Sequence, residues 1–470
     1  MVPFCEIFEG GLMKITYKIK YTIFLLLSMQ TSAYSANLLE VYQQAQISDP
    51  IFQQAVANRL ATKQGVPISA AALLPNIAVK ANPTVARVGY AGTNFQPVFA
   101  NSGAYINPRN VTERYYTLSL SISQTIFNFS QFSTVAQQWS LSKAADATLN
   151  AALEDLMLRV SNAYFAILRD EDNLAYAKAS TLAFKQSFDQ MNEQYKVGIK
   201  TITDVYTAEA SYDNAVASQI EAETTLANDK ENLRVMTGIF YPHLDKLSEK
   251  FPLMTPQPQL VETWVERAIR QNWAIKAAQY QTQAARQNIR VQMGGHFPTV
   301  SLQSTFSRQY SHDFDHYPSF AERNGAGTTS TRAIGLNIDL PVFSGGLVHA
   351  ETKQAMYQYH ASRDQLEQTL RNTQNTTRQS FSNVVLGISK VKADLATIKS
   401  LESALSGLQE SYKIGTETLV NVLDQREKVF LAQTTYATDR YAYVINFLTL
   451  KQAAGTLSFD DLCAINQWLQ

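Results

Sequence analysis

The sequence contains few cysteines, no excess charge and no apolar run long enough to span a membrane as a helix. Its two cysteines are Cys5 and Cys463, so a chain that loses its N-terminus keeps one thiol and no intramolecular disulfide. Lysine and arginine total 40, as do aspartate and glutamate, which gives no net charge to attract nucleic acid. The apolar run Tyr21–Met29 is about half of the ~20 residues that a spanning helix needs, and no other run approaches that length.

Motifs of catalysis and cofactor binding are also missing. The sequence has no Gly-rich phosphate loop, no GxSxG and no His/Cys set with metal-ligand spacing. The segment HDFDH, residues 312–316, holds two His and two Asp, but it lies in a stretch rich in Gly, Ser and Thr, which favours a solvated loop. We therefore expect no catalytic residue, no metal and no cofactor.

Residues 1–35 have the order of a secretory signal peptide. Basic residues precede the run Tyr21–Met29, and the small residues TSAYSA follow it. Cleavage after Ser35 would place Ala33 at the −3 position, and Met13 is a better start than Met1. The alternative is an anchor that remains attached. The basic residues are Lys14, Lys18 and Lys20.

Short segments recur in the same order, 216 to 223 residues apart. YKVGIKTITDV is repeated as YKIGTETLVNV, LSLSISQTIF as IGLNIDLPVF, and LLPNIAVK as HFPTVSLQ. We predict a duplication in which residues 36–237 form the first structural repeat and 260–455 the second. Residues 238–259, which contain four prolines, would be a linker, and 456–470 a C-terminal tail.

Each repeat contains two segments in which apolar residues alternate with small or polar ones. Leu118, Leu120 and Ile122 alternate with serines, and the second repeat alternates in the same way. Four such strands of roughly ten residues match a membrane barrel with a wet lumen, although a soluble sandwich would show the same alternation. Four strands cannot close a useful barrel, so several chains would have to pool them. The predicted lumen residues are Ser119, Ser121, Asn337 and Asp339, and the segments 89–114 and 311–332 are predicted loops.

After the second strand of each repeat, apolar residues follow at 3-4 spacing for about six heptads. This is the spacing of a coiled-coil seam, and in the first repeat only Asp170 and Thr181 interrupt it. Gly198 and Gly415 stand just past these helices, where a C-cap favours glycine, and Thr with Asp or Asn follows as an N-cap for a returning helix. The repeated motif is therefore predicted to be the tip of a long αα-hairpin.

Taken together, these segments resemble the TolC family of outer-membrane efflux and secretion channels. The resemblance covers Asn37–Leu462 and is carried by the two tip motifs, LPVFSGGLVHAETKQA, NLLEVYQQAQISDP and YVINFLTLKQAAGTLSFDDL. It implies an α+β membrane protein in the outer membrane of a Gram-negative bacterium. Three chains would close one 12-stranded β-barrel, continuous with a coiled-coil periplasmic tunnel.

The same resemblance implies partners and a gate. The homotrimer would contact outer-membrane lipid and dock to a periplasmic adaptor (membrane fusion) protein and an inner-membrane pump, with Gly198 and Gly415 at the docking tips. It would export drugs, as in multidrug resistance, or proteins, as in type I secretion. Family members carry two acidic rings near the closed tip, and their positions correspond to Asn421 and Asp424, so one ring is lost here. We expect a weaker cation preference, carried by Asp424 and by Asp204.

A second departure concerns the link that closes the tip. In the family an Arg at the position of Glu417 contacts a Thr-Asp pair at Thr203 and Asp204, with help from Tyr412. Because Glu417 would repel Asp204, we hypothesise that Lys200, its counterpart in the first repeat, pairs with Glu417, while Tyr412 still bonds Asp204. The alternative is that both charges are only solvated. An exported coiled-coil adhesin or scaffold would explain the heptads, but neither the strands nor the duplication.

Overall fold

The computed structural model describes residues 35–89, 110–312 and 327–470. The predicted signal peptide lies outside these residues apart from Ser35, and so do most of the two predicted loops and of the HDFDH segment. The chain forms two compact units. The sheet unit comprises Ala55–Ala151 and Gln271–Thr373, and the hairpin unit comprises Ala152–Arg270, Gln374–Gln470 and the chain up to Gln54.

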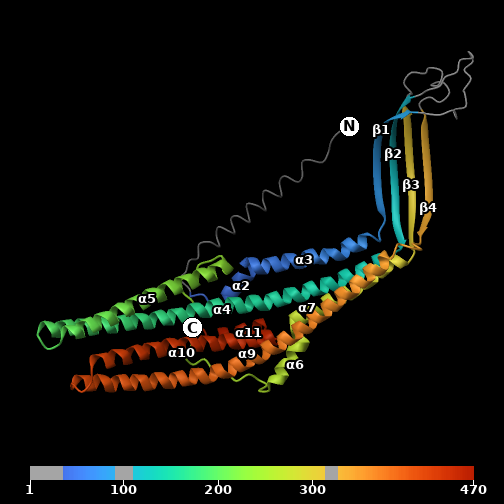
Figure 1. Cartoon of the computed structure of the whole chain (residues 1–470). Helices are drawn as coiled ribbons and strands as arrows, with labels where there is room; N and C mark the ends of the chain where they lie inside the picture. The colour runs from blue at the N-terminus through green and yellow to red at the C-terminus, as the bar shows by residue number, and fades with distance from the viewer. Residues whose placement is uncertain (1–34, 90–109, 313–326) are drawn as a thin grey trace, which may run out of the picture. The chain divides into compact units, whose positions relative to one another are not determined.

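The sheet unit is built on four antiparallel strands in the order β1-β2-β3-β4 (Figure 1). The strands are longer than the predicted ten residues, because two of them extend into the predicted loops at Asn110 and Thr328. Those extensions are polar, so alternation does not reveal them. The strands are β1 Asn76–Gly89, β2 Asn110–Phe127, β3 Thr299–His312 and β4 Thr328–Asp339.

Strand register gives the sheet two different faces. Residues opposite each other on neighbouring strands share a face, and successive residues of a strand alternate between faces. On one face Val79, Leu120 and Phe306 follow one another across β1, β2 and β3. Further apolar residues of β4 lie on the same face and remain exposed in the single chain, namely Ile334, Leu336 and Ile338 at 76%, 59% and 63%.

Short helices precede the strands. The chain forms two consecutive helices before β1 and again before β3. The first pair breaks at Asp49, and in the second Asn272 caps α7 through bonds to the N–H groups of Ala274 and Ile275. The elements are α2 Leu38–Ser48, α3 Pro50–Ala71, α6 Val261–Gln271, α7 Trp273–Met293 and the 3₁₀ turn η1 Gly294–His296.

The hairpin unit contains the C-terminal parts of two very long helices, each followed by a returning helix (Figure 1). Helix α4 spans Phe129–Lys196 and α9 spans Leu347–Lys413. At ~1.5 Å per residue, helices of 68 and 67 residues are each about 100 Å long. The returning helices are α5 Ile202–Thr237 and α10 Leu419–Ala453. The two predicted αα-hairpins are confirmed.

The predicted seam is largely buried. Leu156, Val160 and Ile167 have no solvent exposure, and Asp170 is only 3% exposed although it is charged. The Thr181 hydroxyl finds hydrogen-bond acceptors in the carbonyls of Ala177 and Ala215, the second of which lies on α5. Tyr195 and Leu395, which continue the same spacing toward the helix ends, are 43% and 49% exposed in the single chain.

The proline-containing segment 238–259 packs against the helices. Leu244 and Leu247 are buried, and the Arg440 guanidinium donates to the carbonyls of Leu247 and Ser248. The C-terminal residues form α11, Phe459–Asn466, and Leu469 bridges back to Leu247. No helix within the described ranges is long and apolar enough to cross a membrane. These ranges also contain no group of three His, Cys, Asp or Glu residues that could hold a metal ion.

Candidate functional site at the hairpin tips

The two hairpins end in the same turn. Gly198 and Gly415 have φ of +83° and +81°, the left-handed region that favours glycine. In the first hairpin the N–H of Gly198 donates to the Tyr195 carbonyl at 2.8 Å. In the second, the N–H of Gly415 donates to the Tyr412 carbonyl at 3.1 Å. The repeated motif therefore forms the same turn at the tip of each hairpin, as its sequence predicts.

Each returning helix begins with the predicted cap. Thr201 accepts the N–H of Asp204, while the Asp204 carboxylate accepts the N–H and hydroxyl of Thr201 at 3.1 and 2.9 Å. This reciprocal pair is a capping box, and the carboxylate also lies where the helix dipole favours negative charge. In the second hairpin Thr418 accepts the N–H of Asn421. Asp204 thus stabilises the start of its own helix.

The structure does not bring the predicted closing pair together within the chain. The ammonium of Lys200 lies 4.6 Å from the centre of the Tyr412 ring, a cation–π contact between the two hairpins. Glu417, which lies in the turn before α10, instead accepts a hydrogen bond from the side chain of Asn421 in the first turn of that helix at 2.7 Å. Among the described residues no ion pair joins Lys200 to Glu417. The lysine charge therefore lies over the tyrosine ring.

The expected bond from Tyr412 to Asp204 is also not formed. The Tyr412 hydroxyl contacts the Met191 sulfur at 3.5 Å, and the Asp204 carboxylate is occupied by its capping box. Thr203 and Asp424 are exposed and lie on α5 and α10. Among the predicted gate residues, Asp204, Glu417 and Asp424 are thus anionic and Lys200 is cationic.

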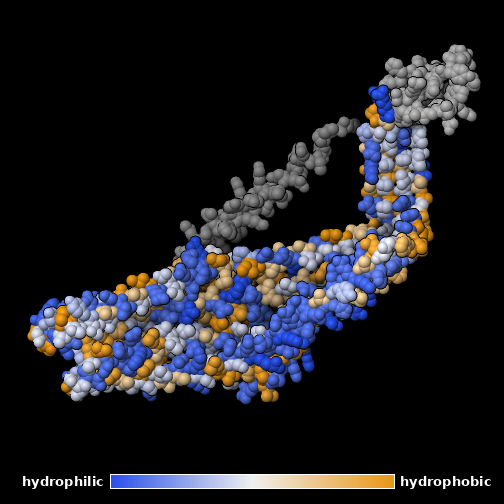
Figure 2. Space-filling view, in the orientation of Figure 1, coloured by the Kyte–Doolittle hydropathy of each residue, from blue (hydrophilic) through white to orange (hydrophobic). Residues whose placement is uncertain are grey.

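Beneath the tips, apolar residues join the two hairpins. Both tips also expose apolar side chains to solvent, as Figure 2 shows at the ends of the two hairpins, where Val197 and Ile199 are 69% and Ile414 is 77% exposed. We call the buried apolar residues that join the two hairpins the tip cluster. Its buried members are Phe184, Met191, Val205, Ala208, Ala215, Leu419 and Leu423, and Phe188, Tyr212, Tyr412 and Phe430 pack against them.

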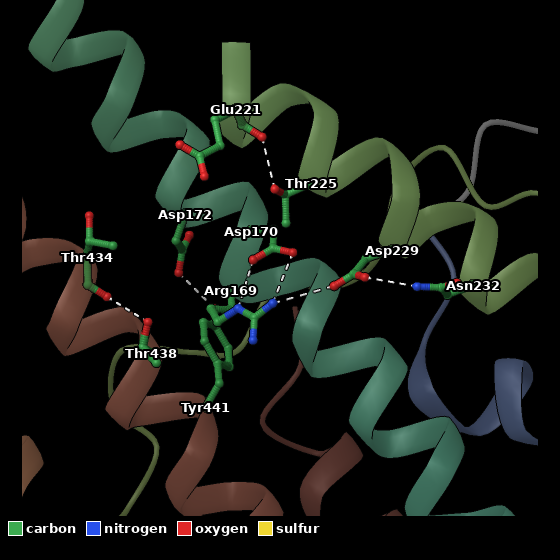
Figure 3. Close-up of polar contacts among 10 residues, drawn as sticks. All are labelled: Arg169, Asp170, Asp172, Glu221, Thr225, Asp229, Asn232, Thr434, Thr438 and Tyr441. Atoms are coloured by element: carbon green, nitrogen blue, oxygen red, sulfur yellow. Dashed lines mark hydrogen bonds and ion pairs between the residues drawn. The ribbon is translucent and has the colours of Figure 1, made fainter. Parts of the chain in front are cut away.

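A polar network joins the hairpin helices farther from the tips (Figure 3). The Arg169 guanidinium donates to both oxygens of Asp170, at 2.7 and 3.1 Å, and reaches Asp229 on α5 at 3.5 Å. Burial and the neighbouring Asp229 raise the pKa of Asp170 despite the arginine.

Tyr441 on α10 extends this region to the second hairpin by donating to the Asp172 carboxylate at 2.8 Å. Burial, together with Asp172, raises the pKa of Tyr441. The interruption of the seam at Asp170 was the only sequence signal for this network. The partners Asp229 and Tyr441 lie far along the chain and were not predicted.

The predicted lumen residues share one face of the sheet. Ser119 lies opposite Ser307, and Asn337 lies opposite Ser301, which is on the same face of β3. Ser121 and Asp339 lie on this face as well, opposite Thr305 and Thr299. The face opposite the apolar one is thus small and polar across three strands.

The chain is similar to known outer-membrane proteins. The family model described as "Outer membrane efflux protein" matches residues 41–239 and 264–456. Outer membrane protein TolC of Escherichia coli (strain K12) is 32% identical over 457 residues, which cover 95% of this chain and 88% of TolC. The alkaline protease secretion protein AprF of Pseudomonas aeruginosa is 24% identical over 439 residues, covering 93% of this chain and 88% of AprF.

Among solved structures, the CmeC outer membrane channel of Campylobacter jejuni matches the fold. It superposes with a TM-score of 0.74 at 17% identity and covers 92% of this chain and 89% of CmeC.

Proposed function

Because this chain belongs to the outer membrane efflux protein family, it is an export channel of the outer membrane, and we propose that three copies form it by pooling their strands into one barrel. The helices of the three chains would continue the barrel as a periplasmic tunnel. The division of the chain into two repeats of 36–237 and 260–455, joined by 238–259, is part of this proposal.

The observation that carries the proposal is an open sheet with two unlike faces. β1 and β4 each pair with one neighbour only, so within the part of the chain that the structure describes both outer edges are unpaired. Exposed edges of 14 and 12 residues invite pairing with further strands. Joining β4 of one chain to β1 of the next closes the edges, turns the apolar face to lipid and leaves Ser119, Ser121, Asn337 and Asp339 facing a wet lumen.

The hairpin tips would form the periplasmic gate, at the end of the tunnel away from the barrel. The residues that we assign to it are Lys200, Thr203, Asp204, Tyr412, Glu417, Asn421 and Asp424. Asp424 is exposed on α10 and Asn421 is neutral, so one acidic ring would act where the family has two. In a bilayer with a salt gradient, Asp424→Asn should shift the reversal potential toward zero, whereas Asn421→Asp should increase the cation preference.

The tips also suit an adaptor. Val197, Ile199 and Ile414 are exposed apolar residues beside Gly198 and Gly415, and a protein surface of this kind is buried by a partner. We infer a periplasmic adaptor that delivers cargo from an inner-membrane pump. The family description favours small molecules as cargo, and the protease secretion protein AprF favours proteins. The same channel can serve both, because adaptor and pump select the cargo.

Disulfide trapping tests the shared barrel. In a Cys463→Ser background, Val79→Cys on β1 is combined in turn with Arg332→Cys, Ile334→Cys or Leu336→Cys on β4, all on one face. Oxidation should give covalent dimers and trimers with three chains as the ceiling. As a control, Leu120→Cys replaces Val79→Cys, because β2 is an inner strand and should not reach another chain. A ladder that continues past three chains, or monomers only, would contradict the proposal.

A further inference from the structure

On the face of α10 that packs against the first hairpin, a charged residue lies among apolar ones near the tip. Leu419, Leu423 and Phe430 all contact the tip cluster, and Arg426 lies between them at the 4-3-4 spacing of a heptad seam. A single polar residue in such a seam fixes the register between helices at a cost in stability.

The contacts of Arg426 are specific to one turn of α4. Its Nη1 donates to the Ala183 carbonyl at 2.9 Å and to the Ser187 hydroxyl at 2.7 Å. The Ser187 hydroxyl in turn donates to the Ala183 carbonyl at 3.1 Å. The guanidinium is therefore held by one turn of the first hairpin, although 239 residues separate Arg426 from Ser187.

Displacement of α10 by one turn would remove the hydroxyl partner. One turn beyond Ser187 the side chain on α4 is Met191, and one turn before it is Ala183, neither of which offers a strong acceptor. Among the described residues no carboxylate lies within ion-pair distance of Arg426, and burial lowers its pKa. A half-buried arginine keeps its charge, so losing these bonds leaves it desolvated without a partner.

Packing on the other side of Phe430 cannot fix the register as firmly. A cavity of about 420 Å³ lies there between α4, α5 and α10, and Phe184, Phe430 and Thr434 are among its lining residues. Near the tip, the seating of α10 thus depends on the tip cluster, whose apolar contacts are not directional, and on Arg426. Farther from the tip, the bond from Tyr441 to Asp172 also joins α10 to α4.

We propose that Arg426 is a positioning residue that sets the register of the second hairpin on the first at the tips. Burial of the Arg426 guanidinium costs desolvation energy, but its hydrogen bonds favour a single register of the two hairpins. The consequence for conduction rests on the proposed function: a tip with one register holds the entrance closed, and a tip with several registers leaks.

Pulsed electron–electron spin resonance tests the register directly. Spin labels are placed on exposed sites of α4 and α10 with Asp189→Cys and Val420→Cys in the Cys463→Ser background, and labelled chains are diluted with unlabelled ones. The otherwise wild-type protein should give one narrow distance. Arg426→Met, whose side chain suits an apolar seam, should add a second distance that differs from the first by up to about 5 Å, since helices slip by three or four residues at ~1.5 Å each.

We expect at least about a tenfold rise in the ratio of displaced to seated hairpins, which corresponds to about 1.4 kcal/mol. Arg426→Lys keeps the charge but loses the fork of donors and should broaden the distance as well. Ser187→Ala, a mild change in a helix, should broaden it less. The matched control is Lys428→Met, which removes an exposed cation two residues away and should leave the distance unchanged.

Single-channel conductance is recorded on the same variants. If distances for Arg426→Met and Ser187→Ala equal the wild-type distance, the assigned role of Arg426 is wrong, whatever the conductance. If the distances broaden and basal conductance rises, both the role and the gate hold. Broadened distances with unchanged conductance support the role of Arg426 and contradict the gate at the tips.

Discussion

Replacing a tip glycine with alanine perturbs the turn that ends each hairpin. Gly198 has φ of +83°, and a Cβ added there would meet no atom within 4 Å, so backbone strain is the only penalty. A left-handed residue with a Cβ costs ~1–2 kcal/mol, from which the stiffer unfolded chain subtracts ~0.4–1 kcal/mol. The net loss is about 1 kcal/mol, which is about a fivefold rise in local opening.

Hydrogen exchange read by mass spectrometry measures that opening. The Ile199 N–H donates to the Gln194 carbonyl at 2.9 Å, so a peptide covering residues 194–204 should exchange about fivefold faster in Gly198→Ala. Gly198→Asn should lose less, since Asn tolerates this region. Gly415→Ala should act equally on the second tip, where φ is +81°.

Gly407→Ala is the control, because Gly407 lies inside α9 with open space around it, and alanine favours the helix by ~1 kcal/mol. It should slow exchange in its own segment or leave it unchanged. Equal exchange in wild type, Gly198→Ala and Gly198→Asn would refute the strained turn.

Three further outcomes are expected. Arg159→Met should lower the free energy of unfolding by ~3–5 kcal/mol in a thermal unfolding assay. The Asp49 carboxylate, which is 2% exposed and lies 2.6 Å from the Arg159 guanidinium, would stay buried without its ion-pair partner. Arg234→Met, which removes an exposed arginine, should cost ~0–1 kcal/mol in the same assay. The raised pKa of Asp170 means that its contribution to stability is fully present below its ordinary pKa and is lost as pH rises through the raised one. Asp170→Asn should therefore gain stability relative to wild type between pH 4 and pH 7, and a difference that is the same at both pH values would show that the group is not perturbed. Ile334→Lys on the apolar face should cost ~2–4 kcal/mol and reduce folding into lipid vesicles, while Asn337→Lys on the polar face should not, and equal folding of the two would contradict the assignment of the faces.

Local chemistry made the hairpin ends predictable from sequence. A glycine after a long apolar 3-4 pattern, followed by Thr and Asp or Asn, requires only a left-handed turn and a cap, and both lie within a few residues. The four strands were predictable for the same reason, because alternation is a local property. Their polar extensions at Asn110 and Thr328 carry no alternation and were assigned to loops.

Contacts between distant segments were not predictable. Whether Lys200 contacts the Tyr412 ring or Glu417 depends on how the two hairpins pack against each other, and neither motif encodes this packing alone. Arg426 interrupts an apolar seam at a readable spacing, yet its partners on α4 could be identified only from the structure. The four prolines of segment 238–259 predict a linker, but they do not reveal that its Leu244 and Leu247 are buried.

Electron microscopy of the detergent-extracted protein, with particle mass measured alongside, tests whether three chains share one barrel and one tunnel. We expect a three-fold particle with the mass of three chains and a long helical cylinder extending from one side of the detergent belt. A compact particle with the mass of one chain would contradict it.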